Sequence, residues 1–360
     1  MSIPHRFDIL VCPHPSLSPC RFGKGETVST TKTGVATEPQ PESDGLHPVS
    51  PSMLLPERCG DFELYLAQNG SMVLYAVRGE LFSEEHRERL ADRGVDRLYV
   101  KSVEKEHFDN YVREHLDDIL ADESIPVQER ANVWLDATSV LARKAFDRTF
   151  PKSLNNVRFS RIRKILRQSM SFFSRPEVLR HLAVFTGQGR EQYHHGIGVM
   201  VLAAGVMNTL VRDDADHLVS VCSGAILHDV GKLTLPENLF DRHEDDLTPE
   251  ELEQAHSHPV LGVSRCASVQ LPQEALHCIL FHHEREDGSG FPSQALGSVL
   301  PLHAKVVGLC DEYENLTREK PWRKAFTPFE ALSHIKAEKD RFDPDLIKRL
   351  ILVLSRAEIM

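Results

Sequence analysis

Residues 222–232 have the sequence CSGAILHDVGK, an apolar helix that is closed by His228 and Asp229. A single His-Asp pair says little about function, because the dipeptide is common and usually structural. The surrounding sequence is more informative, since eleven of the 19 histidines lie between His194 and His303. The histidine-rich segment around this helix is therefore where we expect the chemistry of the protein.

Two further apolar helices are expected in the same segment. Residues 274–284 (EALHCILFHHE) end in a His-His pair, and residues 303–316 (HAKVVGLCDEYENL) carry an aspartate. Imidazoles and carboxylates without thiolates suit iron, manganese or zinc better than a sulfur-bound structural zinc. Helices with inward-facing ligands are a known way to build such a site. In chain order, the candidate ligands are His195, His228, Asp229, His258, His282, His283 and Asp311.

The other histidines of this segment have weaker patterns. His194 and His256 are ambiguous neighbours of better candidates. Cys310 precedes Asp311, but adjacent helix residues point about 100° apart, so Cys310 is assigned to the core. The histidines without a partner pattern are expected to be solvated or packed: His217, His243, His277 and His303.

The composition and charge limit the class of partner. At 360 residues the chain can form two compact units, and its 41% hydrophobic and 26% charged residues are ordinary for a globular protein. A formal charge of −11 argues against binding of nucleic acid or of an anionic membrane. An anionic substrate would therefore need local positive charge from metals or from a few lysines and arginines.

No membrane segment or secretory leader is predicted. The longest apolar runs, near 198–206 and 346–354, are too short to span a bilayer, and the N-terminus lacks a basic start followed by an apolar stretch. The seven cysteines are scattered without a C-x-x-C pair, which indicates reduced thiols. We therefore expect a cytoplasmic protein with no membrane insertion.

The N-terminal half is expected to hold a tail and a small domain. Residues 1–56 contain nine of the 21 prolines and are predicted to be a disordered tail rich in Pro, Ser and Thr. Residues 57–116 are predicted to be a small α/β module, with a hairpin turn at Asn69-Gly70 and a helix capped by Ser83. A regulatory input and a simple packing role both stay open for it.

The C-terminal two thirds are expected to be helical. Residues 117–189 are predicted to be a charged helical linker, with or without a signalling role, and residues 190–360 an all-α bundle. Thr248 and Thr327 each precede a proline and stand three residues before a glutamate, as at the start of a helix. The fold class is therefore mainly α, a helical bundle preceded by a small α/β module.

The ordered ligand series resembles the HD superfamily of metal-dependent phosphohydrolases, and in particular its HD-GYP subfamily. The resemblance covers roughly residues 190–350 and does not extend to the first 115. The matching stretches are HGIGV at 195–199, LHDVGKLTLP at 227–236, LTPEE at 247–251, HPVLG at 258–262, HHEREDGSGFP at 282–292, and Asp311 followed by Leu316-Thr317.

The resemblance implies an HD-type bundle whose metal ligands are the seven candidates above. It implies that Asp229 bridges two metals, that Lys232 contacts the scissile phosphate, and that Glu191 holds a third metal. The alternative for Glu191 is a surface carboxylate. The implied cofactors are two or three divalent ions, with iron or manganese favoured. The implied reaction is hydrolysis of the 3′–5′ phosphodiester bonds of the bacterial second messenger cyclic di-GMP to pGpG and/or GMP by a metal-activated hydroxide.

The sequence departs from the family pattern beside the site. Phe291 replaces the tyrosine of Gly-Tyr-Pro, Asn315 replaces an alanine, and Lys320 replaces an arginine, which puts substrate affinity in doubt. Lys320 and Arg323 form a basic cluster that could contact phosphate or could belong to an exposed loop. A tight turn lies beside the His-His pair, and it could approach a ligand or a partner: Gly288, Ser289, Gly290, Phe291 and Pro292.

Two other functions stay open. One is a non-catalytic receptor or scaffold that docks a diguanylate cyclase domain through residues 288–292. The other is a phosphohydrolase that acts on a different nucleotide or cyclic dinucleotide. A homodimer also stays open, whereas nucleic acid is not an expected partner.

Overall fold

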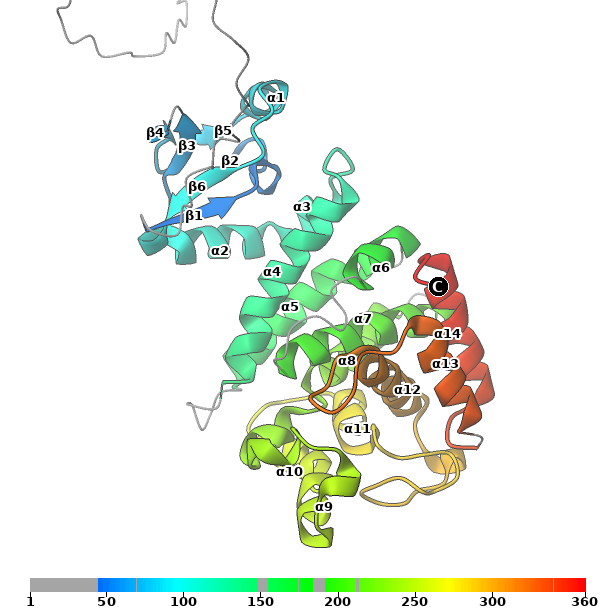
Figure 1. The fold of residues 1–360 in the computed structure, drawn as a ribbon. Helices are drawn as coiled ribbons and strands as arrows, with labels where there is room; N and C mark the ends of the chain where they lie inside the picture. Colours follow the sequence, from blue (N-terminus) through cyan, green and yellow to red (C-terminus); the bar gives the residue numbers. More distant parts are fainter. Residues whose placement is uncertain are drawn as a thin grey trace, which may run out of the picture. The chain divides into compact units, whose positions relative to one another are not determined.

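The computed structural model describes residues 45–68, 70–147, 155–173, 175–183, 192–211, 214–338 and 340–360. These residues form a small N-terminal sheet with short helices, followed by a long series of helices (Figure 1). The predicted fold class, mainly α with a small α/β module before the bundle, is confirmed.

The N-terminal module is built on an antiparallel four-stranded sheet in the order β1-β6-β3-β4. The predicted hairpin is present as β3 and β4. A second, two-stranded sheet pairs β2 with β5. The strands are β1 (Leu46–Val49), β2 (Arg58–Cys59), β3 (Leu64–Gln68), β4 (Ser71–Ala76), β5 (Leu81–Phe82) and β6 (Leu98–Lys101).

One boundary of the predicted tail is wrong. The tail was expected to reach residue 56, but β1 (Leu46–Val49) pairs with β6 inside that range, and a short helical turn follows at Pro51–Met53. Val49 and Leu54 are buried in the core of the module. The strand was not predicted because the proline content of this segment suggested disorder. Its pairing depends on β6, a strand about fifty residues away in the sequence.

Short helices complete the module. The helix α1 (Glu84–Asp92) begins at Ser83 as predicted, where the hydroxyl accepts from the backbone N–H of His86. The side chain of His86 returns the contact by accepting from the backbone N–H of Ser83, so the cap is reciprocal. The module ends with α2 (Lys105–Glu114) and α3 (Leu116–Ala121).

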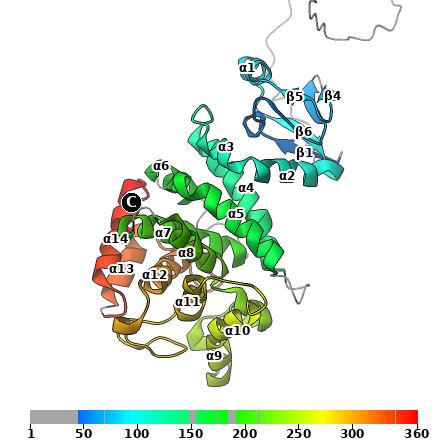
Figure 2. The same cartoon turned by 180° about the vertical axis from the view of Figure 1, so that it is seen from behind.

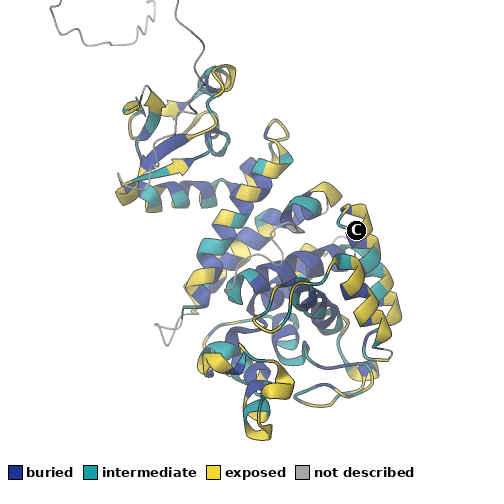
Figure 3. Ribbon diagram, viewed as in Figure 1, coloured by how far each residue is buried: buried dark blue, intermediate teal, exposed yellow. Residues whose placement is uncertain are grey.

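The segment predicted as a linker forms α4 (Val127–Ala145), α5 (Asn156–Phe173) and α6 (Pro176–Ala183). One face of α4 and of α5 is buried, as Figure 3 shows. Trp134 of α4 is fully buried and donates to Ser169 Oγ of α5 at 2.7 Å. Because α5 also packs against α8, these helices are part of the helical core and not solvated connectors.

The bundle that follows has its most buried helices at the centre. The helix α7 packs against α8 and α12, and α11 packs against α8 and α12; Figures 1 and 2 show α7, α8 and α12 side by side from opposite directions. The helices are α7 (Gln192–Leu210), α8 (Ala215–Leu227), α9 (Pro249–His256), α10 (His258–Arg265), α11 (Gln273–Phe281), α12 (Leu302–Thr317), α13 (Pro328–Ala337) and α14 (Pro344–Arg356).

The predicted helix starts are confirmed at α9 and α13. Thr248 and Thr327 each accept from the backbone of a glutamate three residues on, and that glutamate accepts from the backbone of the threonine. Asp343 likewise caps α14. Among the described residues, no helix is both long enough and apolar enough to cross a membrane.

Candidate metal centre

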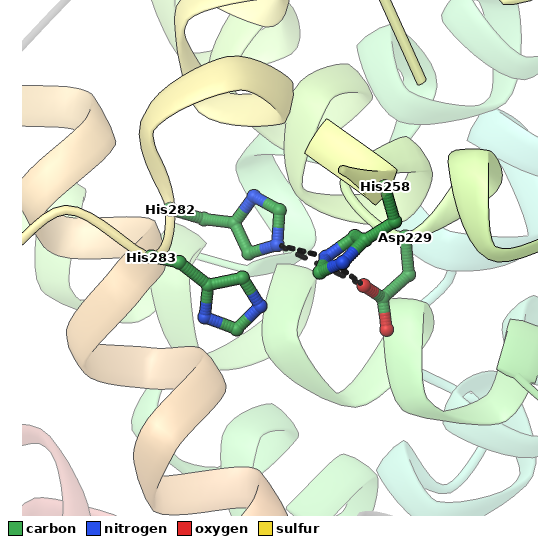
Figure 4. Close-up of side chains that lie close together, drawn as sticks. All are labelled: Asp229, His258, His282 and His283. Carbon is green, nitrogen blue, oxygen red and sulfur yellow. Dashed lines mark hydrogen bonds and ion pairs between the residues drawn. The ribbon is translucent and has the colours of Figure 1, made fainter. Parts of the chain in front are cut away.

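The seven ligands predicted from the sequence meet at one place in the bundle. They come from α7, α12, the start of α10, and the residues just after α8 and α11. They form two adjoining groups, and within each the candidate ligand atoms lie within 4.8 Å of one another. The first group is Asp229, His258, His282 and His283, drawn in Figure 4, and the second is His195, His228 and Asp311.

The helix ends orient the imidazoles. His228, His258 and His282 each stand three residues after a carbonyl that receives the Nδ1 proton, at 2.7, 2.8 and 2.9 Å respectively. In a neutral ring this contact leaves Nε2 without a proton, as a metal ligand requires. The repeated geometry explains why these histidines stand at helix ends, where carbonyl groups lack intrahelical partners.

The Nε2 atoms of these rings point at one another in pairs. His258 Nε2 lies 3.2 Å from His282 Nε2, and His195 Nε2 lies 3.1 Å from His228 Nε2. In a pair of neutral rings whose Nδ1 atoms carry the hydrogens, no proton lies between the two Nε2 lone pairs. The contact is therefore repulsive unless a cation binds both nitrogens. Burial lowers the pKa of His282 to about 4 and keeps the ring neutral. The donor set therefore fits bound metal.

Asp229 lies between the two groups. Its Oδ1 is 3.3 Å from His258 Nε2, and its Oδ2 is 3.5 Å from His228 Nε2. The buried Oδ1 accepts no hydrogen bond from any described residue. Burial alone would raise the pKa of Asp229, but Lys232 and His228 outweigh it, so the pKa lies well below the ordinary value. The carboxylate is therefore ionised where it could bridge two cations.

A buried carboxylate behind His195 was missed by the sequence analysis. Glu314 of α12 is fully buried and accepts from His195 Nδ1, whereas His228, His258 and His282 use backbone carbonyls. Arg318, one helical turn later, donates from Nε to both carboxylate oxygens of Glu314 at 3.1 Å. Such outer contacts set the tautomer of a ligand. The i, i+4 Glu-Arg spacing was visible, but nothing in the sequence placed it beside His195.

Positive charge lies next to the ligands. Lys232 Nζ donates to Asp229 Oδ2 at 2.6 Å, and its side chain is 17% exposed. Lys320 Nζ donates to Asn315 Oδ1 at 2.7 Å, and Asn315 in turn donates to Asp311 Oδ1 at 2.8 Å. Two of the departures from the family pattern, Asn315 and Lys320, are thus in contact with each other. Burial, and then the nearby Lys232, lower the pKa of Lys320 to about 8.

The profile of the HD domain family matches residues 165–346, which is just over half of the chain. The chain belongs to the HD domain family. The resemblance to the HD superfamily and its HD-GYP branch is thereby confirmed.

Known proteins with this domain are similar over part of the chain. The response regulator RpfG of Xanthomonas campestris, a cyclic di-GMP phosphodiesterase, is 33% identical over 45% of this chain and 41% of its own length. A cyclic di-GMP phosphodiesterase of Pseudomonas aeruginosa is 26% identical over 51% of this chain and 44% of its own. The chain therefore spans less than half the length of these relatives.

A solved structure shares the fold more widely. An HDG"Y"P protein from Bdellovibrio bacteriovorus superposes with a TM-score of 0.61 at 22% identity. The match covers 86% of this chain and 99% of that protein. At this identity the likeness concerns the fold of the HD protein and not its activity.

The loop after the His-His pair turns inward. The ring of Phe291 stacks on His283 and on His256, with centroids 4.5 and 3.9 Å apart. A side chain at Gly290 would lie 2.3 Å from the carbonyl oxygen of His283, so only glycine allows this close approach. Of residues 288–292, only Ser289 is exposed. The loop supports the HD site directly, and the docking of a partner through it stays a prediction.

Two predicted site residues are placed differently from the rest. Arg323 donates to the carbonyl groups of Leu316, Lys324 and Asn315, so its guanidinium holds the loop after α12 and does not face the ligands as a free cation. This contact pattern favours the loop interpretation over the phosphate interpretation. Glu191 lies outside the described residues, and a third metal site stays a prediction.

Proposed function

We propose that this HD domain is a metal-dependent phosphodiesterase that hydrolyses cyclic di-GMP to linear pGpG and/or GMP. The observation that carries the proposal is the neutral pair His258 and His282, whose Nε2 atoms face each other at 3.2 Å beside a buried, ionised Asp229. Four buried imidazoles and two buried carboxylates in one centre are costly without cations. A purely structural role would not favour this arrangement.

The donor set indicates which cations would be held. Asp229 with His258, His282 and His283 would hold one ion, and Asp311 with His195 and His228 would hold the other. Nitrogen and oxygen donors without sulfur suit iron or manganese, with Glu191 proposed for a third ion. Bound divalent ions would supply Lewis acidity and an activated water for phosphodiester hydrolysis.

The residues of the chain itself would bind and orient the phosphate. Lys232 is close enough to lower the pKa of Lys320, and both lysines lie beside the ligands. An ammonium group suits a phosphoryl oxygen as a compact charge. The pair supplies the local positive charge that a chain with a net charge of −11 needs for an anionic substrate. Preorganised charge of this kind stabilises the charge that develops during hydrolysis.

The identity of the substrate is proposed from the relatives. Both relatives described above are cyclic di-GMP phosphodiesterases, and each is similar to about half of this chain. A different cyclic dinucleotide would use the same phosphodiester chemistry. Cyclic di-GMP is therefore the first substrate to test.

The test is product analysis with full-length protein purified without oxygen, with its metal content measured. Cyclic di-GMP, a hybrid cyclic GMP-AMP and a simple nitrophenyl phosphodiester are offered in parallel, and the products are separated by chromatography. We expect pGpG or GMP from cyclic di-GMP and none from the Asp229→Ala variant. If only the hybrid cyclic GMP-AMP were hydrolysed, the proposed substrate would be the hybrid and not cyclic di-GMP. Tight binding of cyclic di-GMP without turnover by metal-loaded protein would favour the receptor function.

A further inference from the structure

A second histidine cluster lies away from the metal centre. His217 is in the first turn of α8, His303 is at the start of α12, and His277 is in α11. His277 Nδ1 lies 3.2 Å from His303 Nε2. The ring of His217 meets that of His303 edge-on, with centroids 5.6 Å apart. These residues were expected to be solvated or packed, and they are packed against one another because three separate helices bring them together.

The pair has the separation of a ligand pair in the metal centre, although its rings are stacked at 5° whereas those of His258 and His282 are tilted at 56°. His277 and His303 have centroids 5.4 Å apart. His258 and His282 have the same 3.2 Å nitrogen separation and centroids 5.3 Å apart. The separation from His217 to His303 is a few tenths of an ångström wider than these. An ion held by all three would require their rings to turn, because their ring nitrogens do not converge within 4.8 Å as those of the metal centre do.

The cluster is accessible from solvent, and its imidazoles can act as metal ligands. All three histidines are half-buried, so an ion can reach them from solvent. Burial, with His277 and His217 nearby, lowers the pKa of His303 to about 4, so its ring is neutral at physiological pH. Gln273, one turn before His277, lies 3.3 Å from the other nitrogen of that ring. Neutral imidazoles bind borderline cations such as Zn²⁺, Ni²⁺ and Cu²⁺.

We propose that His217, His277 and His303 form a second metal site, separate from the catalytic centre, that takes one borderline divalent cation such as Zn²⁺. The same three helices carry ligands of both sites, since α8 leads to His228, α11 leads to His282 and α12 contains Asp311. At 1.5 Å per residue, the two sites are roughly 16 Å apart along α8. Occupation of the second site would therefore brace the helices that position the first.

Zinc counting tests the proposal. Full-length protein is equilibrated with Zn²⁺, dialysed and analysed for metal per chain, beside the double variant His277→Gln/His303→Gln. We expect the double variant to bind one ion fewer per chain. The matched control is His107→Gln/His115→Gln, which changes two histidines of the N-terminal module and should keep the full count. Circular dichroism verifies that each protein is folded.

Single variants keep the test decisive if the double variant fails to fold. Zn²⁺ added to protein with a filled catalytic centre should raise the Tm, and His217→Gln or His303→Gln should reduce that rise. Equal zinc counts and equal Tm shifts in all proteins would overturn the proposal and leave a hydrogen-bonded imidazole pair. The outcome is independent of the phosphodiesterase proposal, because the Asp229-dependent metals are expected to stay bound in every one of these variants.

Discussion

Replacing Glu314 with glutamine keeps the size of the side chain but removes the charge behind a metal ligand. In the folded protein Glu314 is fully buried and accepts hydrogen bonds from both His195 and Arg318. Burial alone would raise its pKa, but His195 and Arg318 outweigh it and lower the pKa from 4.5 to about 2. The glutamine has one carbonyl oxygen, so it cannot serve both donors equally well.

The structure gives two expected magnitudes. A pKa lowered from 4.5 to about 2 corresponds to about 3 kcal/mol of stability. Because the folded-state pKa is the lower one, this contribution is complete above the unfolded pKa and is lost as the pH falls toward 2. At pH 7 the variant should therefore lose a few kcal/mol in urea unfolding. Loss of a carboxylate behind a ligand histidine should also weaken metal binding by about 10- to 100-fold.

A matched control separates these two effects. Glu312 lies on the same helix and pairs with Arg285 at 3.2 Å, and no contact to a histidine of the metal centre is described for it. Burial raises the pKa of Glu312, so Glu312→Gln should not lose stability through the removed charge, and its metal affinity, measured by competition with a chelator, should stay close to that of the unchanged protein. The reasoning is refuted if Glu314→Gln binds metal as tightly as the unchanged protein. It is also refuted if both variants weaken metal binding to the same extent.

Three further predictions concern the residues around the metals. Asp229→Ala should abolish turnover and lower bound metal while circular dichroism shows nearly unchanged helix content, and full activity would contradict the bridging role. Lys232→Ala should keep its metals and lose turnover, because an ammonium binds phosphate and not a cation; a metal loss as large as in Asp229→Ala would contradict this. Since the pKa of Lys320 is about 8, its charge is lost as the pH rises through 8. The KM for cyclic di-GMP should therefore rise between pH 7 and 9, and Lys320→Arg should remove that rise; identical pH profiles would argue against phosphate contact by Lys320.

The local features of this protein could be predicted from the sequence alone. The helix starts at Thr248 and Thr327 depend on contacts three residues apart, and the structure has both. The seven candidate ligands stand in short motifs with few alternatives, and the structure brings all seven together. In each case the deciding interaction lies within one helical turn or one motif, so the order of residues is enough.

Only the tertiary structure decided which distant side chains meet. Glu314 reaches His195 across 119 residues of sequence, and His277 meets His303 across 26. The strand β1, which lies among prolines, could not be predicted because its partner β6 is about fifty residues away in the sequence. The protonated nitrogen of each ligand ring likewise depends on which acceptor the fold places behind it. A sequence pattern cannot predict such pairs, because they are stabilised by burial and by contacts that exist only once the helices have packed.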